Sequence, residues 1–241
     1  NMCGIAGIFT KTNIPNLENR ITSMNNSIVH RGPDAGGIFV KNNIGLGHRR
    51  LSIIDTREGA NQPMHTLSKI WHVVFNGEIY NFQEIKENLN HTFLTNSDTE
   101  VIIAAVEEKG VQWFIERANG MFAIALFNSL TDELYLLRDR LGIKPLYYYK
   151  DANKIIFSSE IKGILASGLI DACFNEAAID EYLGNRHVRA PYTFFKNIYQ
   201  LEAGHYLKIN SLININKFRY WDIPIGFNLD EDYNEKELTE E

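Results

Sequence analysis

The sequence predicts an α+β fold in which antiparallel strands outnumber helices. Short apolar runs recur along the 241 residues, and most are separated by clusters of Gly, Asn, Asp and Pro of turn length. Two longer stretches have helical spacing instead. Strands joined by short turns pair antiparallel, because parallel neighbours need long crossover connections. The helices are therefore expected to pack outside the sheets.

The first half of the chain opens with a predicted buried strand over residues 2–9, an apolar run interrupted by Gly4 and Gly7. Pro15 can begin a helix over residues 15–29, in which apolar side chains recur at intervals of three and four. Further strands are predicted at residues 36–40, 45–54 and 70–75. The chain is thus expected to begin inside the fold.

The second half starts with a capping-box pattern, Ser97-Asp98-Thr99-Glu100, which predicts a helix that ends near Gly110. Polar turns at residues 128–132 and 151–153 separate a second group of apolar runs. These runs are predicted strands at residues 121–127, 133–138, 146–149 and 155–157. We expect them to form a second set of antiparallel strands.

Composition bounds the class of protein. A hydrophobic fraction of 44% is enough for one large domain, assigned to residues 1–222, and the acidic, apolar-poor residues 223–241 are expected to be a linker. A net charge of −6 with scattered Lys and Arg argues against nucleic acid as a partner. No apolar run approaches the roughly 20 residues of a membrane span and no leader opens the chain, so we expect a cytoplasmic protein without a membrane partner.

The two cysteines are too few for the disulfide framework of a secreted domain, so reduced thiols are expected. Cys173 is assigned the ordinary role of a free cysteine, a small buried apolar side chain. Cys3 has the same ordinary reading, but it lies close to the terminus, directly before Gly4 in a segment that also contains Gly7. If processing exposes its α-amine, whose pKa is roughly 8, that amine can act as the base for its own thiol.

Two arginines open the predicted strand at residues 45–54. Because neighbouring strand residues point to opposite faces, either Arg49 or Arg50 must face inward. A buried guanidinium needs a partner, which is either a substrate carboxylate or an internal acidic side chain. The HRGPD turn at residues 30–34 likewise fits a structural or a functional role.

Asn76 and Gly77 directly follow the predicted strand at residues 70–75. The pair is a common hairpin turn signal, but the Asn76 side-chain amide and the Gly77 N–H also suit an oxyanion hole. Asp98, in the first turn of a predicted helix, either stabilises the helix dipole or binds an ammonium group. The residues alone leave these alternatives open.

Taken together, these segments resemble the class II glutamine amidotransferases, and specifically the N-terminal domain of glutamine-dependent asparagine synthetases. The matching segments are CGIAG at 3–7, HRGPD at 30–34, RLSI at 50–53, NGEIYN at 76–81, SDTE at 97–100, RDRLGIKPLY at 138–147 and SSEIK at 158–162. The resemblance covers nearly the whole chain. It implies two antiparallel sheets packed between helical layers, the N-terminal nucleophile hydrolase arrangement.

The resemblance also implies a function and roles for single residues. The domain would hydrolyse L-glutamine to glutamate and ammonia through a thioester on the nucleophile Cys3. By the same resemblance, Asn76 and Gly77 would be the oxyanion donors, and Arg50 would bind the α-carboxylate of glutamine. Glu78 and Asp98 would bind its α-ammonium, and the backbone around Ile53 would line the glutamine site. No metal or cofactor is expected in this fragment.

In the full-length relatives the ammonia reaches a C-terminal synthetase domain that uses ATP and Mg²⁺ to activate aspartate. That domain is expected to be missing here, and a homodimer is a further expectation. Residues 187–191 depart from the asparagine synthetase pattern, in which a Tyr and an additional Pro are common. A different acceptor, such as an amino sugar, a nucleotide precursor or a surface polysaccharide, therefore stays open, as does a silent glutamine-binding regulatory domain. An initiator Met is normally removed before a small residue such as Cys3, but Asn1 in front of Met2 is expected to hide that Met from the processing enzyme.

Overall fold

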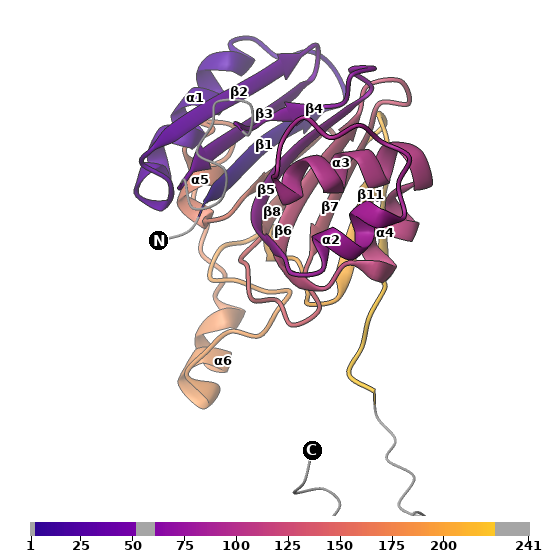
Figure 1. Cartoon of the computed structure of the whole chain (residues 1–241). Helices are drawn as coiled ribbons and strands as arrows, with labels where there is room; N and C mark the ends of the chain where they lie inside the picture. Colours follow the sequence, from indigo (N-terminus) through magenta and orange to yellow (C-terminus); the bar gives the residue numbers. More distant parts are fainter. Residues whose placement is uncertain (1–2, 52–60, 225–241) are drawn as a thin grey trace, which may run out of the picture.

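Two six-stranded antiparallel sheets form the centre of the computed structural model, which describes residues 3–51 and 61–224 (Figure 1). The first sheet has the strand order β10-β8-β9-β1-β3-β2. Its strands are β1 (Gly4–Thr10), β2 (Ala35–Lys41), β3 (Ile44–Arg50), β8 (Tyr147–Lys150), β9 (Lys154–Ser158) and β10 (Ile198–Gln200). The N-terminal strand therefore lies in the middle of a sheet, between partners that are distant in sequence.

The second sheet has the order β12-β11-β7-β6-β5-β4. Its strands are β4 (Met64–His65), β5 (Trp71–Ile79), β6 (Gly120–Asn128), β7 (Glu133–Arg138), β11 (His205–Ile209) and β12 (Ile215–Arg219). Strand β4 pairs only with the first part of β5, at Val73 and His72. Beyond that point, no strand within residues 3–51 and 61–224 pairs with β5 on this side as far as Ile79, which leaves an open edge.

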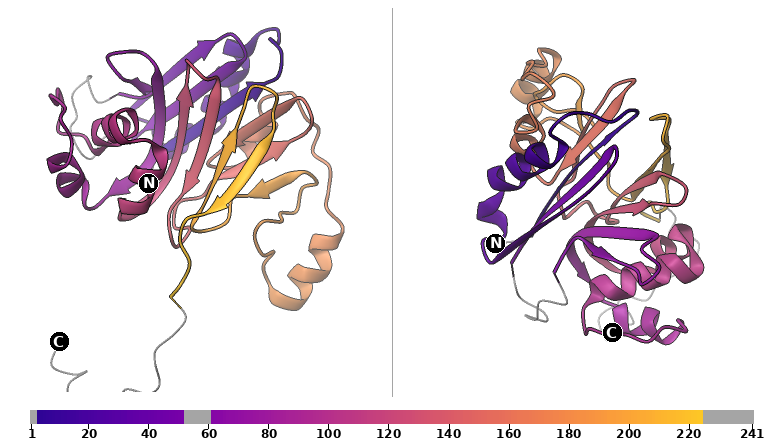
Figure 2. Two further views of the ribbon diagram at one scale, coloured as in Figure 1. Left: turned by 90° about the vertical axis from the view of Figure 1, so that its right-hand side faces the viewer. Right: turned by 90° about the horizontal axis from the view of Figure 1, so that it is seen from above.

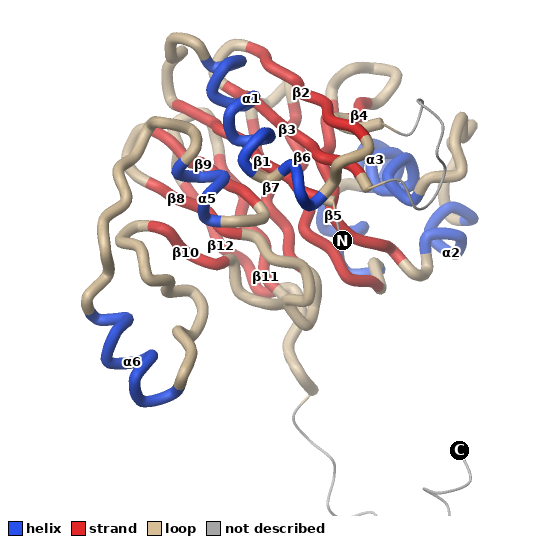
Figure 3. The backbone as a smooth tube through the Cα atoms, turned by 90° about the vertical axis from the view of Figure 1, so that its left-hand side faces the viewer, coloured by secondary structure: helices blue, strands red, loops and turns tan. Residues whose placement is uncertain are grey.

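Helices cover the outer faces of both sheets, as the views in Figures 2 and 3 show. The first sheet packs on α1 (Leu17–Ser27) and α5 (Ile161–Leu165), and the second on α2 (Phe82–Glu87), α3 (Asp98–Lys109) and α4 (Val111–Arg117). A third apolar cluster, which includes Phe9, Leu46 and Phe127, fills the space between the sheets. The fold is a four-layered αββα sandwich, which confirms the predicted α+β class and layer order.

A further helix, α6 (Ala177–Asn185), projects from the body of the domain (Figure 1). Of its residues, Ala178 alone is buried. No helix among the described residues is both long and apolar enough to cross a membrane.

The strand parity determines which side chains reach the space between the sheets. In β1, Ile5 and Phe9 belong to the central cluster, whereas Ala6 and Ile8 face α1. Gly4 pairs with Arg49, so the register places Cys3 opposite Arg50. Residues of odd number in β1 and of even number in β3 thus share the inner face.

Most predicted elements are present within a few residues of their expected bounds. The helix expected at 15–29 spans Leu17–Ser27 and continues as a short 3-10 helix, Val29–Arg31. The strand expected at 45–54 ends at Arg50, and its residues 52–54 lie outside the described part of the chain. The hairpin turn considered at Asn76 and Gly77 is wrong, because both residues lie within β5.

The helix that begins with the Ser97 cap ends as predicted, but its capping pattern differs. The Ser97 hydroxyl accepts a hydrogen bond from the Thr99 N–H at 3.1 Å. The Glu100 carboxylate does not complete the expected box; it binds the backbone N–H groups of Leu94 and Thr95 at 2.8 and 2.6 Å. Glu100 therefore orders the loop that leads into α3.

Candidate active site

The thiol of Cys3 lies directly before the start of β1 and beside the end of β3. The Leu51 N–H donates to Sγ at 3.4 Å, and the Arg31 guanidinium donates through Nε to the Cys3 carbonyl at 3.0 Å. Burial raises the pKa of the thiol, although the Leu51 N–H and the positive charge of Arg50 oppose this effect. A thiol in this environment is mostly protonated at neutral pH and needs a base to become a nucleophile.

The two arginines of β3 point to opposite faces, as the strand pattern requires. Arg49 lies on the outer face, where it donates to the Asn25 carbonyl at 3.2 Å and to the Asn26 side chain. Arg50 is buried on the inner face and donates to Asn61 Oδ1 at 2.6 Å. The inward position of Arg50, opposite Cys3, places a guanidinium beside the thiol.

The open edge of β5 carries the candidate oxyanion donors. Phe122, the partner of Gly77 in β6, directs its N–H and C=O toward Asp139, so the backbone polar groups of Gly77 face away from β6. On the same edge, the N–H of Phe75 binds Gln62 Oε1 at 2.6 Å and the N–H of Ile79 binds Asp98 Oδ2 at 3.1 Å. Gly77 lies between these two closed positions, with its N–H directed outward.

Asn76 points into the space between the sheets, because it shares its strand face with Val74 of the central cluster. Both polar atoms of its side-chain amide are buried, and neither has a hydrogen-bond partner among the described residues. Leaving a buried polar group unpaired typically costs about 1–3 kcal/mol. Such a group is best explained by a ligand that supplies the missing bond.

Gly77 cannot be replaced at this position without moving β6. A side-chain carbon built on Gly77 would lie 2.1 Å from the Met121 carbonyl oxygen and 2.7 Å from Phe122 Cα. Both neighbours are backbone atoms that cannot rotate away. The glycine thus lets the end of β5 stay paired with β6 while its N–H faces the site.

Two carboxylates lie beside the candidate oxyanion donors. Glu78 shares the inner face of β5 with Asn76, and Asp98 begins α3. Burial, strengthened by the negative charge of Glu78, raises the Asp98 pKa to about 6, although N–H groups of Ile79 and Thr99 oppose the shift. The pair forms a negatively charged corner in which a cation would be stabilised.

A cluster of charged side chains around Glu160 contacts the backbone of Cys3. It includes His30 and Arg31 of the HRGPD segment, whose role the sequence alone left open. Glu160 accepts a hydrogen bond from Arg31 Nη1 at 2.9 Å and from His30 Nε2 at 2.8 Å, and it pairs with Lys162 at 3.3 Å. The hydrogen bonds from Arg31, His30 and Lys162 lower the Glu160 pKa to about 2, outweighing its partial burial. Because Arg31 also binds the Cys3 carbonyl, the HRGPD segment holds the chain just before β1 in place.

Two further residues near the site, Asp139 and Lys144, lie in the matching segment at 138–147 but had no role assigned from the sequence. Lys144 is buried, and burial and the positive charge of Arg31 lower its pKa, while the negative charges of Asp139 and Glu78 oppose that shift. Asp139 is fully buried and organises the loop before Lys144, accepting from the backbone N–H groups of Ile143 and Lys144, each at 2.9 Å. His48 could have been found, because it lies two residues before Arg50 on the same strand face.

The structure thus brings most of the expected residues to one end of the sandwich: Cys3, Arg50, Asn76, Gly77, Glu78 and Asp98. Ile53 lies outside the described residues. Cys173 is exposed, so the buried role expected for it is wrong: it lies in the irregular segment between α5 and α6, where no core covers it. Over residues 3–51 and 61–224, no group of His, Cys, Asp and Glu side chains could hold a metal ion.

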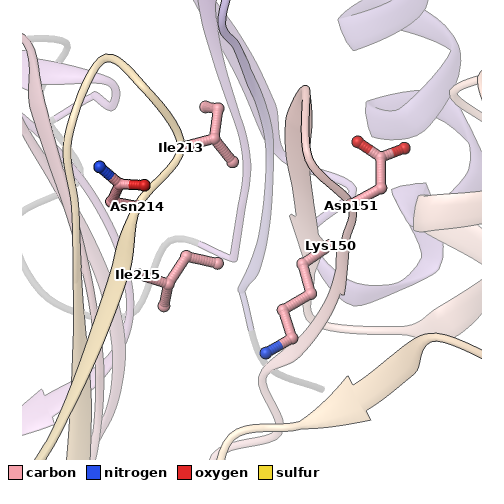
Figure 4. Close-up of a pocket in the computed structure, with 5 residues that line it drawn as sticks. All are labelled: Lys150, Asp151, Ile213, Asn214 and Ile215. Carbon is pink, nitrogen blue, oxygen red and sulfur yellow. The ribbon is translucent and has the colours of Figure 1, made fainter.

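A separate pocket opens at the opposite end of the sandwich (Figure 4). It is lined by Lys150, Asp151, Ile213, Asn214 and Ile215. The β8–β9 turn that contributes Lys150 and Asp151 lies beside Thr10, at the far end of β1 from Cys3. A seven-residue strand spans roughly 20 Å, so this pocket is not part of the candidate site.

Comparisons with known proteins agree on one domain family. The sequence profile of the glutamine amidotransferase domain matches residues 2–221. A putative glutamine-hydrolysing asparagine synthetase 2 from Methanocaldococcus jannaschii is 39% identical over 100% of this chain and 50% of that protein. Asparagine synthetase 2 of Bacillus subtilis is 39% identical over 92% of this chain and 31% of that protein. The chain therefore spans about a third to a half of the length of these relatives.

Solved structures agree with the fold. A glutamine phosphoribosylpyrophosphate amidotransferase from B. subtilis superposes with a TM-score of 0.66 over 91% of this chain and 49% of that chain, at 20% identity. An allosteric regulatory enzyme of purine biosynthesis superposes with a TM-score of 0.68 over the same shares of the two chains, at 18% identity. At these identities the likeness concerns the αββα architecture alone.

Proposed function

Because this chain belongs to the family of glutamine amidotransferase domains, we propose that it hydrolyses the side-chain amide of L-glutamine with Cys3 as the nucleophile. The buried and unpaired amide of Asn76 carries this proposal. The N–H of its strand neighbour Gly77 faces away from β6, at the end of the sandwich where β1 brings the thiol. Two such donors suit an oxygen that becomes negatively charged during acyl transfer.

The proposed reaction begins when the Cys3 α-amine takes the thiol proton and Sγ attacks the amide carbon of glutamine. The carbonyl electron pair moves to oxygen, and Asn76 Nδ2–H and Gly77 N–H donate to that oxyanion. The intermediate collapses as the C–N bond breaks, and the protonated amine gives its proton to the departing ammonia. Water then attacks the thioester, the C–S bond breaks, and glutamate leaves while the thiol regains its proton.

The charged residues around the thiol are assigned to the two ends of the substrate. Arg50 would hold the α-carboxylate, for which the planar guanidinium offers two parallel donors. Glu78 and Asp98 would hold the α-ammonium in the negatively charged corner at the start of α3. The backbone around Ile53 would complete the site.

The test of this function is steady-state ammonia release from L-glutamine by the chain with Cys3 as its first residue. Glutamate and ammonia should appear in equal amounts, and L-asparagine, one methylene shorter, should be a poor substrate. The absence of ammonia release from a folded protein that binds glutamine would favour a silent glutamine-binding domain instead.

We expect Arg50→Lys to raise the KM for glutamine by about 10- to 100-fold, since a hydrogen bond to a charged group contributes roughly 1.5–3 kcal/mol and Lys lacks the planar fork. Arg49→Lys is the matched control, because Arg49 is the strand neighbour that faces α1. Its KM should change less than about twofold. A larger effect of Arg49→Lys would contradict the assignment of Arg50.

Glutamine binding should weaken as the pH falls through about 6. The Asp98 pKa is raised to about 6 by burial, so below that pH its carboxyl is neutral and attracts the ammonium less. Calorimetric titration between pH 5 and 8 should show this dependence in the native chain and lose it in Asp98→Asn.

The same raised pKa means that Asp98 opposes folding increasingly as the pH rises from about 4 to 6. The Tm of Asp98→Asn relative to the native chain should therefore increase over that interval.

The wider activity is proposed from the relatives. Several are named glutamine-hydrolysing asparagine synthetases and are two to three times longer, so we propose that a C-terminal synthetase domain receives the ammonia and amidates aspartate. ATP and Mg²⁺ would be used by that domain. Residues 1–222 would form the glutaminase domain and residues 223–241 the linker between the two. Sequencing the gene beyond the codon for Glu241 would test this proposal, and a different acceptor domain would contradict it.

A further inference from the structure

In the part of the chain that the structure describes, side chains rather than a neighbouring strand bind the open edge of β5. At Phe75, both backbone polar groups are bound: the N–H donates to Gln62 Oε1 at 2.6 Å, and the carbonyl accepts from His48 Nε2 at 3.0 Å. Gln62 is itself tied to Thr99 Oγ1 at 3.3 Å. The residue immediately before the two candidate oxyanion donors is thus fixed from two directions.

His48 makes the bond that crosses between the two sheets. It belongs to β3 of the first sheet, is fully buried on the inner face, and reaches the carbonyl of β5 in the second sheet. A carbonyl only accepts hydrogen bonds, so Nε2 carries the proton. Nδ1 is buried and has no partner among the described residues.

The imidazole stays neutral at physiological pH. Burial lowers the His48 pKa to about 3, and the nearby positive charge of Arg50 acts in the same direction, although the bond to the Phe75 carbonyl opposes the shift. A group with this pKa is a poor general base at pH 7. Its contribution must therefore come from where it holds the Phe75 carbonyl rather than from proton transfer.

We infer that His48 is a positioning residue for the oxyanion hole. The Phe75 carbonyl belongs to the same peptide unit as the Asn76 nitrogen, so fixing this carbonyl sets the peptide plane from which the Asn76 side chain projects. The same bond also fixes the open edge of β5 from which the Gly77 N–H projects. This inference rests on the proposed function and adds a residue from the opposite sheet to it.

A misplaced oxyanion hole should affect the chemical step more than substrate binding. The donors meet a negatively charged oxygen only in the transition state and the tetrahedral intermediate, whereas Arg50, Glu78 and Asp98 would hold the bound substrate. Removing one oxyanion donor typically costs 100- to 1,000-fold in kcat, and a displaced donor keeps part of its effect. We therefore expect about a 10- to 100-fold loss of kcat when the His48 bond is removed.

The experiment compares His48→Phe, which removes the donor, with His48→Gln, whose amide can place an N–H near the position of Nε2. In the chain with Cys3 as its first residue, His48→Phe should lower kcat by about 10- to 100-fold, and His48→Gln should recover most of that loss. In a Cys3→Ala background, the Kd for glutamine should change less than about twofold in both variants.

A second measurement uses the aldehyde analogue of glutamine, in which CHO replaces the carboxamide and which forms a tetrahedral adduct with the Cys3 thiol. Its affinity for His48→Phe should fall by the same factor as kcat/KM, because the adduct oxygen uses the same donors.

The matched control is His72→Phe. His72 is also buried, binds a backbone carbonyl, that of Lys69, at 3.2 Å and stacks on Phe39, but it lies at the opposite end of β5. This control should keep kcat within about twofold.

Equal losses of glutamine and aldehyde affinity in His48→Phe would overturn the inference and show that His48 only holds the sheets together. An unchanged kcat would also overturn it. If His48→Phe does not fold, His48→Asn replaces it, because the shorter amide stays polar but cannot reach Phe75. Equal kcat values for the Asn and Gln variants would then contradict the proposal. If the chain with Cys3 as its first residue and His48 intact released no ammonia, the proposed function would be refuted instead.

Discussion

Replacing Cys3 with alanine is expected to abolish ammonia release from glutamine while leaving the fold and glutamine binding intact. The substitution removes one sulfur atom from a half-buried position and leaves Arg50, Asn76 and Asp98 in place. Loss of the nucleophile costs on the order of a million-fold in comparable acyl-transfer enzymes, so the residual rate should fall below detection. Ammonia release, glutamine calorimetry and the unfolding temperature together separate a chemical defect from a folding defect.

The labelling control for this prediction must account for Cys173, which is exposed. A simple alkylating reagent would modify both thiols, so the reagent should be a glutamine-shaped diazoketone that is recognised before it reacts. Mass spectrometry should find one adduct, on Cys3, and Cys173→Ser should keep the full rate. An adduct on Cys173 in the native chain, or a normal rate for Cys3→Ala, would show that Cys3 is not the nucleophile.

The chain that begins with Asn1 and Met2 should hydrolyse glutamine about 100- to 10,000-fold more slowly than a chain that begins with Cys3, which is the usual contribution of general acid–base assistance. In the longer form, the nitrogen of Cys3 is an amide and cannot take up a proton. Burial raises the pKa of the Cys3 thiol, so little thiolate is present without a base. The two forms should be compared at equal concentration and pH by steady-state ammonia release.

An N-acetylated form that begins with Cys3 separates chemistry from bulk. The acetyl group blocks the amine but adds only three heavy atoms, so this form should be nearly as slow as the extended chain. If the acetylated form were fast and the extended chain slow, the two residues would act by obstructing the site. Equal rates for all three forms would exclude the α-amine as the base.

Much of the fold follows from local patterns. The glycine-punctuated run after Cys3 and the polar turn at residues 151–153 predicted strands that are now seen as β1, β8 and β9. The pairing of β1 with β9 was not predictable, since Ile5 and Ser159 meet only through the tertiary fold. Segments without strong periodicity were missed, and α6 is one of them: its side chains are largely exposed, so the pattern that marks a buried face is absent.

The candidate site was predictable where residue type and strand parity agree. Parity required Arg49 and Arg50 to face opposite sides, and Arg50 is the inward residue. Asn76 and Gly77 show the limit of local signals, because a pair typical of turns lies within a strand that β6 keeps extended. Glu160 could not be linked to Cys3 from sequence, since the link through Arg31 depends on three distant segments. The roles assigned to these residues stay predictions.

The central place of β1 in its sheet has a consequence during synthesis on the ribosome. The strand becomes enclosed only when β9 arrives, and the contact between the Ile5 N–H and Ser159 joins residues 154 positions apart. At 5–20 residues per second, the nascent chain waits roughly 8 to 30 s before that partner exists. During this interval β1 lacks one of its two strand neighbours in the first sheet. The topology therefore makes the enclosure of β1 a late step in the synthesis of the domain.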